Sequence, residues 1–130
     1  MNQDDIKKVV EVTSMMFQAS QSKLAAASAR EKELRQNLEA LVISRRDRAI
    51  ATLGSSDASY VAGADGSWQI WVEQRRRLIN AELGKCLVQQ DQLRDAARKA
   101  FGREQAAKAI LKREETARRK NIARQTHYES

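Results

Sequence analysis

The sequence contains no proline, one cysteine, one histidine and only five glycines. Average usage of about 5% would give roughly six prolines in a chain of this size, so their absence is informative. Proline breaks helices, and a chain without it favours long uninterrupted helices. Aromatic residues make up only 5% of the chain, and its apolar residues are mostly alanine and leucine, so a thick globular core is not expected.

The residues that most catalytic and metal sites require are scarce. Cys86 alone excludes an intramolecular disulfide, and with His127 as the only histidine it excludes a Cys/His zinc site. Residues 63–66 lack the Gly-Lys-Ser/Thr ending of a phosphate loop, and the carboxylates alternate with Lys and Arg as on a solvated helix face. We therefore predict no enzymatic activity, no cofactor, no metal and no small-molecule substrate.

No apolar run is long enough for a signal peptide or for a membrane span of about 18 residues. We therefore expect a cytoplasmic protein. The net charge of +7 and a pI near 9.9 predict attraction to an acidic partner, which could be nucleic acid, an anionic membrane surface or an acidic protein groove. A membrane-surface helix also needs a broad apolar face, which the basic end of the chain lacks.

The first half of the chain carries a heptad pattern that predicts a helix over residues 4–53. Asn2 is a suitable N-cap, and Asp4 and Asp5 oppose the positive end of the helix dipole. Eight of the twelve residues at alternating spacings of four and three are apolar, which is typical of a coiled-coil seam. The twelve are Ile6, Val10, Thr13, Phe17, Ser20, Leu24, Ala27, Glu31, Leu34, Leu38, Leu41 and Arg45.

Residues 54–67 are rich in glycine and serine, so we predict a loop there. A second helix is predicted over 68–128, with Ser67 as its N-cap. Gly84 and Gly102 lie within it and would mark bends or a close approach of the helices. Its seam is Ile79, Leu83, Cys86, Gln90, Leu93, Ala97, Ala100, Glu104, Ala107 and Leu111. On this seam Cys86 is better explained as a small buried hydrophobe than as a redox centre.

Two such helices joined by one connection predict an all-α fold, an antiparallel two-helix coiled-coil hairpin with two long helices that forms a single domain over 1–130. If Leu53 lies opposite Trp68, then Leu38 meets Leu83 and Leu24 meets Ala97. Free in solution, the hairpin is expected to be a monomer.

Both tryptophans, Trp68 and Trp71, lie just before Arg75, Arg76 and Arg77. The favoured interpretation is that the tryptophans cover the loop-proximal end of the hairpin; an exposed protein contact and a nucleic-acid site remain as alternatives. Consecutive helical residues lie about 100° apart, so the three arginines do not form one stripe, which makes nucleic acid unlikely to be the partner.

A second candidate site, the basic cluster, lies near the end of the chain. Between residues 112 and 124 there are six basic and two acidic residues. Positive charge suits the C-terminal end of a helix dipole, but six charges exceed what capping needs, so docking of an acidic protein is the alternative to a merely solvated helix end. The basic cluster consists of Lys112, Arg113, Arg118, Arg119, Lys120 and Arg124.

Together these features resemble the FliJ family, small coiled-coil proteins of the flagellar type III export apparatus. The resemblance rests on a basic chain of two long helices and on aromatic residues that open the second helix before a leucine-rich seam. In this sequence those residues are Trp68, Trp71, Leu78, Ile79 and Leu83.

The resemblance implies a stalk-like, non-catalytic role in flagellum biogenesis and protein transport. FliJ-like proteins stand in the pore of the hexameric export ATPase, regulate it, contact the export gate protein and escort export chaperones, so the membrane is met only through the inner-membrane export apparatus. Trp68, Trp71 and the basic cluster are then the expected partner-binding residues. The alternatives are a generic coiled-coil adaptor and, less favoured, a basic nucleic-acid-binding helical protein.

Overall fold

The computed structural model describes residues 2–53 and 58–129, and nearly all of them are helical. Helix α1 spans Gln3–Leu53 and helix α2 spans Ala58–Glu129. Within the described ranges there is no strand, no cis peptide bond and no residue with positive φ. Neither helix, as far as it is described, contains a stretch of the length and apolar character needed to cross a bilayer.

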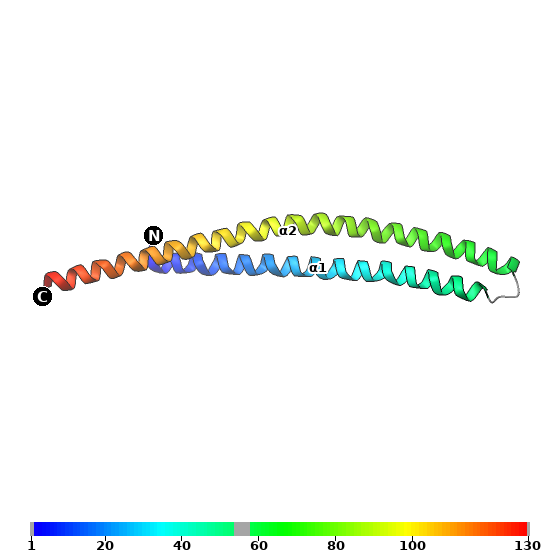
Figure 1. The fold of residues 1–130 in the computed structure, drawn as a ribbon. Coiled ribbons are helices and arrows are strands. Elements are labelled where there is room, and N and C mark those ends of the chain that lie inside the picture. The colour runs from blue at the N-terminus through cyan, green and yellow to red at the C-terminus, as the bar shows by residue number, and fades with distance from the viewer. Residues whose placement is uncertain (1, 54–57, 130) are drawn as a thin grey trace. The chain divides into compact units, whose positions relative to one another are not determined.

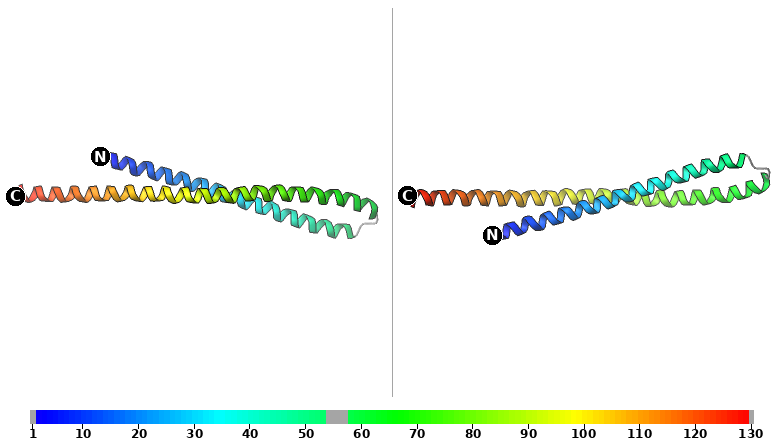
Figure 2. Two further views of the ribbon diagram at one scale, coloured as in Figure 1. Left: turned by 90° about the horizontal axis from the view of Figure 1, so that it is seen from above. Right: turned by 90° about the horizontal axis from the view of Figure 1, so that it is seen from below.

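The predicted all-α hairpin of two long antiparallel helices is confirmed. By its internal packing the chain divides into two units. Unit 1 comprises the residues up to Ala25 together with those from Gln92 onward, and unit 2 runs from Ala26 to Asp91. In each unit a segment of α1 runs antiparallel to a segment of α2 (Figures 1 and 2).

The start of α1 is fixed by its cap. The side-chain Oδ1 of Asn2 accepts a hydrogen bond of 2.8 Å from the backbone N–H of Asp5, and the Asn2 carbonyl accepts one of 3.1 Å from Ile6 N–H. This satisfies amide groups that have no partner within the helix. The predicted N-cap is therefore confirmed.

The heptad seams are the faces that pack. Eleven of the twelve predicted seam residues of α1 are buried or partly buried, and only Arg45 is exposed. All ten predicted seam residues of α2 are buried or partly buried. The spacing of apolar residues was thus sufficient to identify the packed face of each helix.

The core of unit 2 is a cluster of aliphatic side chains and one thiol. Leu34 is only 2% exposed, and it packs with Ile79, Leu83 and Cys86. Leu38 and Leu41 pack against this cluster from α1. Burying a leucine side chain of this kind contributes about 1.5–3 kcal/mol, so this cluster is a main source of stability in unit 2.

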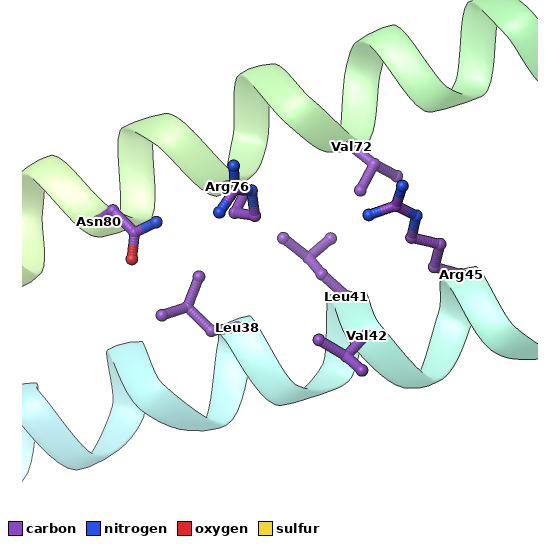
Figure 3. A pocket seen from close by; sticks show the side chains of 7 residues that line it. All are labelled: Leu38, Leu41, Val42, Arg45, Val72, Arg76 and Asn80. Atoms are coloured by element: carbon purple, nitrogen blue, oxygen red, sulfur yellow. The ribbon is translucent and has the colours of Figure 1, made fainter.

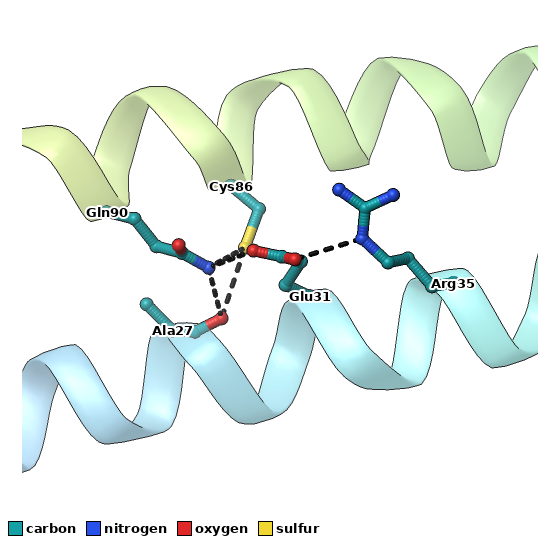
Figure 4. A network of polar contacts seen from close by, with 5 residues as sticks. All are labelled: Ala27, Glu31, Arg35, Cys86 and Gln90. Carbon is teal, nitrogen blue, oxygen red and sulfur yellow. Dashed lines mark hydrogen bonds and ion pairs between the residues drawn. The ribbon is translucent and has the colours of Figure 1, made fainter.

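A polar layer lies next to this core (Figure 4). The buried Gln90 amide nitrogen donates to Glu31 Oε1 at 2.8 Å and to the Ala27 carbonyl at 3.3 Å. Cys86 Sγ also donates to the Ala27 carbonyl, at 3.3 Å, and Arg35 forms an ion pair of 2.9 Å with Glu31. The buried amide and the thiol are thus both satisfied, as predicted for Cys86 in its role as a small buried residue.

Unit 1 has a thinner core, built mainly from small side chains. Ile6 of α1 and the alanines at 97, 100 and 107 of α2 are buried. The rings of Phe17 and Phe101 pack across the helices with centroids 5.3 Å apart and an interplanar angle of 53°. This tilted geometry is favourable for aromatic pairs, and it adds an apolar contact between the helices in unit 1.

The predicted loop over 54–67 is wrong for residues 58–67, because α2 begins at Ala58. Ser67 consequently lies inside the helix and is not an N-cap. Residues 54–57 of that prediction lie outside the described residues. Glycine and serine have low helix propensity, so propensity alone does not predict a helix here. In the structure Asp65 and Trp68 both contact Arg48 of α1, and such tertiary contacts override propensity.

The early start of α2 also displaces the pairing of the helices. Leu24 and Ala97 line the same shallow hollow, and Leu38 packs on the cluster that includes Leu83, so the predicted partners are near each other. Ala27, however, meets Gln90 and Cys86, which lie four and eight residues before its predicted partner Arg94, or about one and two helical turns.

The glycines within α2 do not interrupt it. The helix continues through Gly84 and Gly102, and a Cβ atom added at either position would have no atom within 4 Å. The predicted close approach of helices at these glycines is therefore wrong.

Candidate partner-binding surfaces

The basic cluster begins beside α1 and continues on the part of α2 that extends past the start of α1. Arg118 Nη1 donates a hydrogen bond to Gln3 Oε1, which marks where the first turn of α1 meets α2. From residue 119 to residue 129 every side chain is exposed. In Figure 1 this end of α2 lies beyond the N-terminal end of α1. Lys112, Arg113, Arg119 and Lys120 line shallow depressions on this helix. Arg119, Lys120 and Arg124 lie past Arg118 and are exposed, so a partner could approach them freely.

The positive charges of the basic cluster are not neutralised within the described residues. No member of the cluster forms an ion pair there, although Glu114 and Glu115 lie on the same helix. Just before the cluster, by contrast, Lys99 pairs with Asp95 and Lys108 pairs with Glu104. The unpaired charges begin at Lys112, before the contact of Gln3 with Arg118, and they leave a local field that attracts anionic groups.

The surface between the basic side chains is lightly hollowed. One shallow depression has Ala109 and Ala117 at its base and Lys112, Arg113 and Lys120 around it. A second lies on the neighbouring face and includes Leu111 and Arg119. An alanine base with a cationic rim suits an acidic protein surface better than a small molecule, because a single helix cannot enclose a ligand.

Trp68 packs towards α1. The guanidinium of Arg48 lies 4.8 Å from the centroid of the Trp68 ring, and Arg48 Nε lies 3.4 Å from Asp65 Oδ1. The second contact is an ion pair without hydrogen-bond geometry, and the buried Nε has no hydrogen-bond partner. Arg48 was not among the predicted residues, yet it lies seven residues after Leu41, so the heptad spacing could have identified it.

Trp71 does not share that contact. Its side chain is 54% exposed, whereas the next residue, Val72, is 3% exposed and packs in the interface. The prediction that both tryptophans form one apolar cover at the end of the hairpin is therefore wrong. A helix turns about 100° per residue, so Val72 occupies the face towards α1 and Trp71 is directed to its side. Trp71 remains available to a partner.

The arginines after the tryptophans are largely engaged with one carboxylate. Glu73 accepts hydrogen bonds of 3.1 and 2.8 Å from Arg76, and Arg77 lies 3.4 Å from the same Glu73. The hydrogen bond from Arg76 holds the pKa of Glu73 below its ordinary value, with the positive charges of both arginines adding to the effect. Of the three arginines, Arg75 alone is outside this group. The pairing of Arg76 and Arg77 with Glu73 reduces the positive charge available to a phosphate backbone.

Comparison with known proteins gives no relative of this chain: no protein-family model, curated protein or solved structure matches it. The described residues also contain no group of three or more His, Cys, Asp and Glu side chains placed to hold a metal ion. Function is therefore argued from the two surfaces themselves, the basic cluster and the region of Trp71.

Proposed function

We propose that this protein is a non-enzymatic, stalk-like helical hairpin that docks on an acidic protein through the basic cluster, as a component of a type III export apparatus. The observation that carries the proposal is the basic extension of α2, whose exposed charges have no ion-pair partner among the described residues. An unneutralised basic helix is complementary to an acidic protein surface and accelerates encounter with it.

The specific form of the proposal follows the FliJ-like plan. The partner of the basic cluster is then the hexameric export ATPase, and the exposed Trp71 is left to contact the export gate protein or an export chaperone. An aromatic side chain that is more than half exposed is typical of a residue that anchors a protein interface. Under this proposal the protein works in the cytoplasm at the inner-membrane export apparatus.

Two features support docking of a protein over binding of nucleic acid. Trp68 is packed on Arg48 and cannot stack on a base without breaking that contact. Two of the three consecutive arginines are held by Glu73.

The direct test is a binding and turnover assay with the export ATPase. Changing Arg119, Lys120 and Arg124 together to glutamate should abolish pull-down of the ATPase and its stimulated ATP hydrolysis. These three residues form no hydrogen bond or ion pair with another described residue, so the hairpin should stay folded, which circular dichroism will verify. The control changes Lys23, Arg46 and Lys85 to glutamate. These are exposed basic residues of the same total charge that lie outside the basic cluster.

Equal loss of binding in both triple variants would show that only net charge matters, and unchanged binding in the first would remove the proposed role of the basic cluster. Light scattering on the free protein distinguishes the generic adaptor. A stable dimer or tetramer at micromolar concentration would argue against a single hairpin held in a ring, whereas a monomer agrees with it. Binding to single-stranded DNA at about 50 mM salt would favour the nucleic-acid alternative.

A further inference from the structure

In unit 2 the seam of each helix is interrupted by an arginine. On α1 the series Leu38 and Leu41 continues to Arg45, and on α2 the buried residues Val72 and Ile79 have Arg76 between them. Coiled-coil seam positions ordinarily take apolar side chains that fill the space between the helices. Both arginines are instead exposed, so their charged ends lie outside the interface and the space is left incompletely filled.

The result is a hollow of about 230 Å³ between the helices of unit 2. Its apolar part is formed by Leu38, Leu41, Val42 and Val72, and its polar rim by Arg45, Arg76 and Asn80. Figure 3 shows Arg45 reaching from α1 towards Val72, and Arg76 lying beside Leu41. We call this site the arginine-flanked hollow. Val42 is 66% exposed, so its methyl groups are accessible to an incoming side chain.

The charges around the arginine-flanked hollow favour an anionic occupant. Arg76 is hydrogen-bonded to Glu73, which also attracts Arg77, so one carboxylate serves two guanidinium groups. Arg45 forms no ion pair with any described residue. Arg45 is therefore the guanidinium of this hollow that lacks a carboxylate partner among the described residues, and an incoming carboxylate would be stabilised beside it.

Combined with the apolar floor, this chemistry selects a particular kind of partner. A small inorganic anion would leave the leucine and valine side chains in contact with water. A second copy of this chain is opposed by the net charge of +7 on each molecule. We propose that the arginine-flanked hollow docks an acidic segment of another protein, with one leucine-sized side chain on the floor and a carboxylate beside Arg45.

This site lies in unit 2 and shares no residue with the basic cluster, so the inference does not depend on the proposed function. The experiment measures fluorescence anisotropy of a labelled synthetic peptide titrated with the full chain. The first peptide carries a single leucine among glutamates and aspartates. In a second peptide glutamines and asparagines replace the acids, and in a third alanine replaces the leucine. Binding is expected for the first peptide, and both others should bind at least about fivefold more weakly.

Matched variants locate the site. Arg45→Glu should weaken binding of the first peptide about tenfold, while Arg46→Glu, the same charge change about 100° around the helix, should have little effect. Val42→Ser should weaken binding about fivefold, and Ile43→Ser should not, because Ile43 does not line the hollow. All four residues are exposed, so the fold should be kept.

Three outcomes would overturn the inference. The first is that the first peptide does not bind. The second is that Arg45→Glu and Arg46→Glu weaken its binding equally. The third is that single-stranded DNA displaces the peptide, and does so to the same extent in both arginine variants. The second and third outcomes would mean that diffuse positive charge, and not the arginine-flanked hollow, attracts the peptide.

Discussion

Replacing Gly84 or Gly102 by alanine should stabilise the hairpin. Both glycines lie inside α2 with ordinary φ, and an added Cβ would meet no atom within 4 Å. Alanine is favoured over glycine in a helix interior by about 1 kcal/mol, because glycine loses more backbone entropy on folding. The two sites lie in different units, so their effects should add to about 2 kcal/mol in the double variant.

The assay is urea unfolding followed by far-UV circular dichroism, with thermal unfolding as a second measure. Each single variant should raise the midpoint temperature by roughly 4 °C. Ala96→Gly, at an exposed position of the same helix, is the matched control and should cost about 1 kcal/mol. If the control behaves as expected but Gly84→Ala or Gly102→Ala lowers the free energy of unfolding, then that glycine is needed for a contact or bend absent from this structure.

Three further predictions concern the packed face of the hairpin. Leu34→Ala should cost about 2–5 kcal/mol in urea unfolding, whereas Leu78→Ala, at a position 59% exposed, should change stability by no more than about 0.5 kcal/mol. Gln90→Ala should cost about 2 kcal/mol, because both hydrogen bonds to α1 are lost, and an unchanged midpoint would show that water replaces them. The hydrogen bond from Ser14 keeps the pKa of Glu104 below its ordinary value. This stabilisation is therefore present above the unfolded pKa of about 4.3 and is lost as the pH falls through the lower folded pKa. Glu104→Gln should make urea midpoints less dependent on pH in that acid range, and equal slopes for both proteins would contradict the assignment.

The fold could be predicted because one signal determines it. A two-helix hairpin has a single packed face on each helix, and a heptad repeat specifies that face directly. The start of α1 was equally readable, because Asn2 has both the side chain and the position of a cap. The start of α2 was not, since residues 58–67 have the composition of a loop and are helical in the structure.

The candidate surfaces were predicted only in part. The basic cluster could be identified from the sequence. Its position relative to the start of α1 could not, because that position depends on how the two helices are aligned along each other. Trp68 packs against α1 and Trp71 is exposed because the two residues lie on different sides of α2, and the side that faces α1 at this end was not predicted. The arginine-flanked hollow arises from Arg45 and Arg76, which are far apart in sequence, so neither arginine alone indicates a site.

The hydrogen-bonded layer of Gln90 and Glu31 has a mechanical consequence. If α1 slid by one heptad along α2, the Gln90 amide would face Leu34 and Leu38 in one direction or Ser20 and Leu24 in the other, and Glu31 would lose its donor from the other helix. Leaving the buried Gln90 amide unpaired among leucines costs about 1–3 kcal/mol, which disfavours an alternative alignment that a purely apolar seam of alanine and leucine would tolerate. The two helices of unit 2 should therefore resist sliding past each other, so that a force applied along one helix is transmitted to the other.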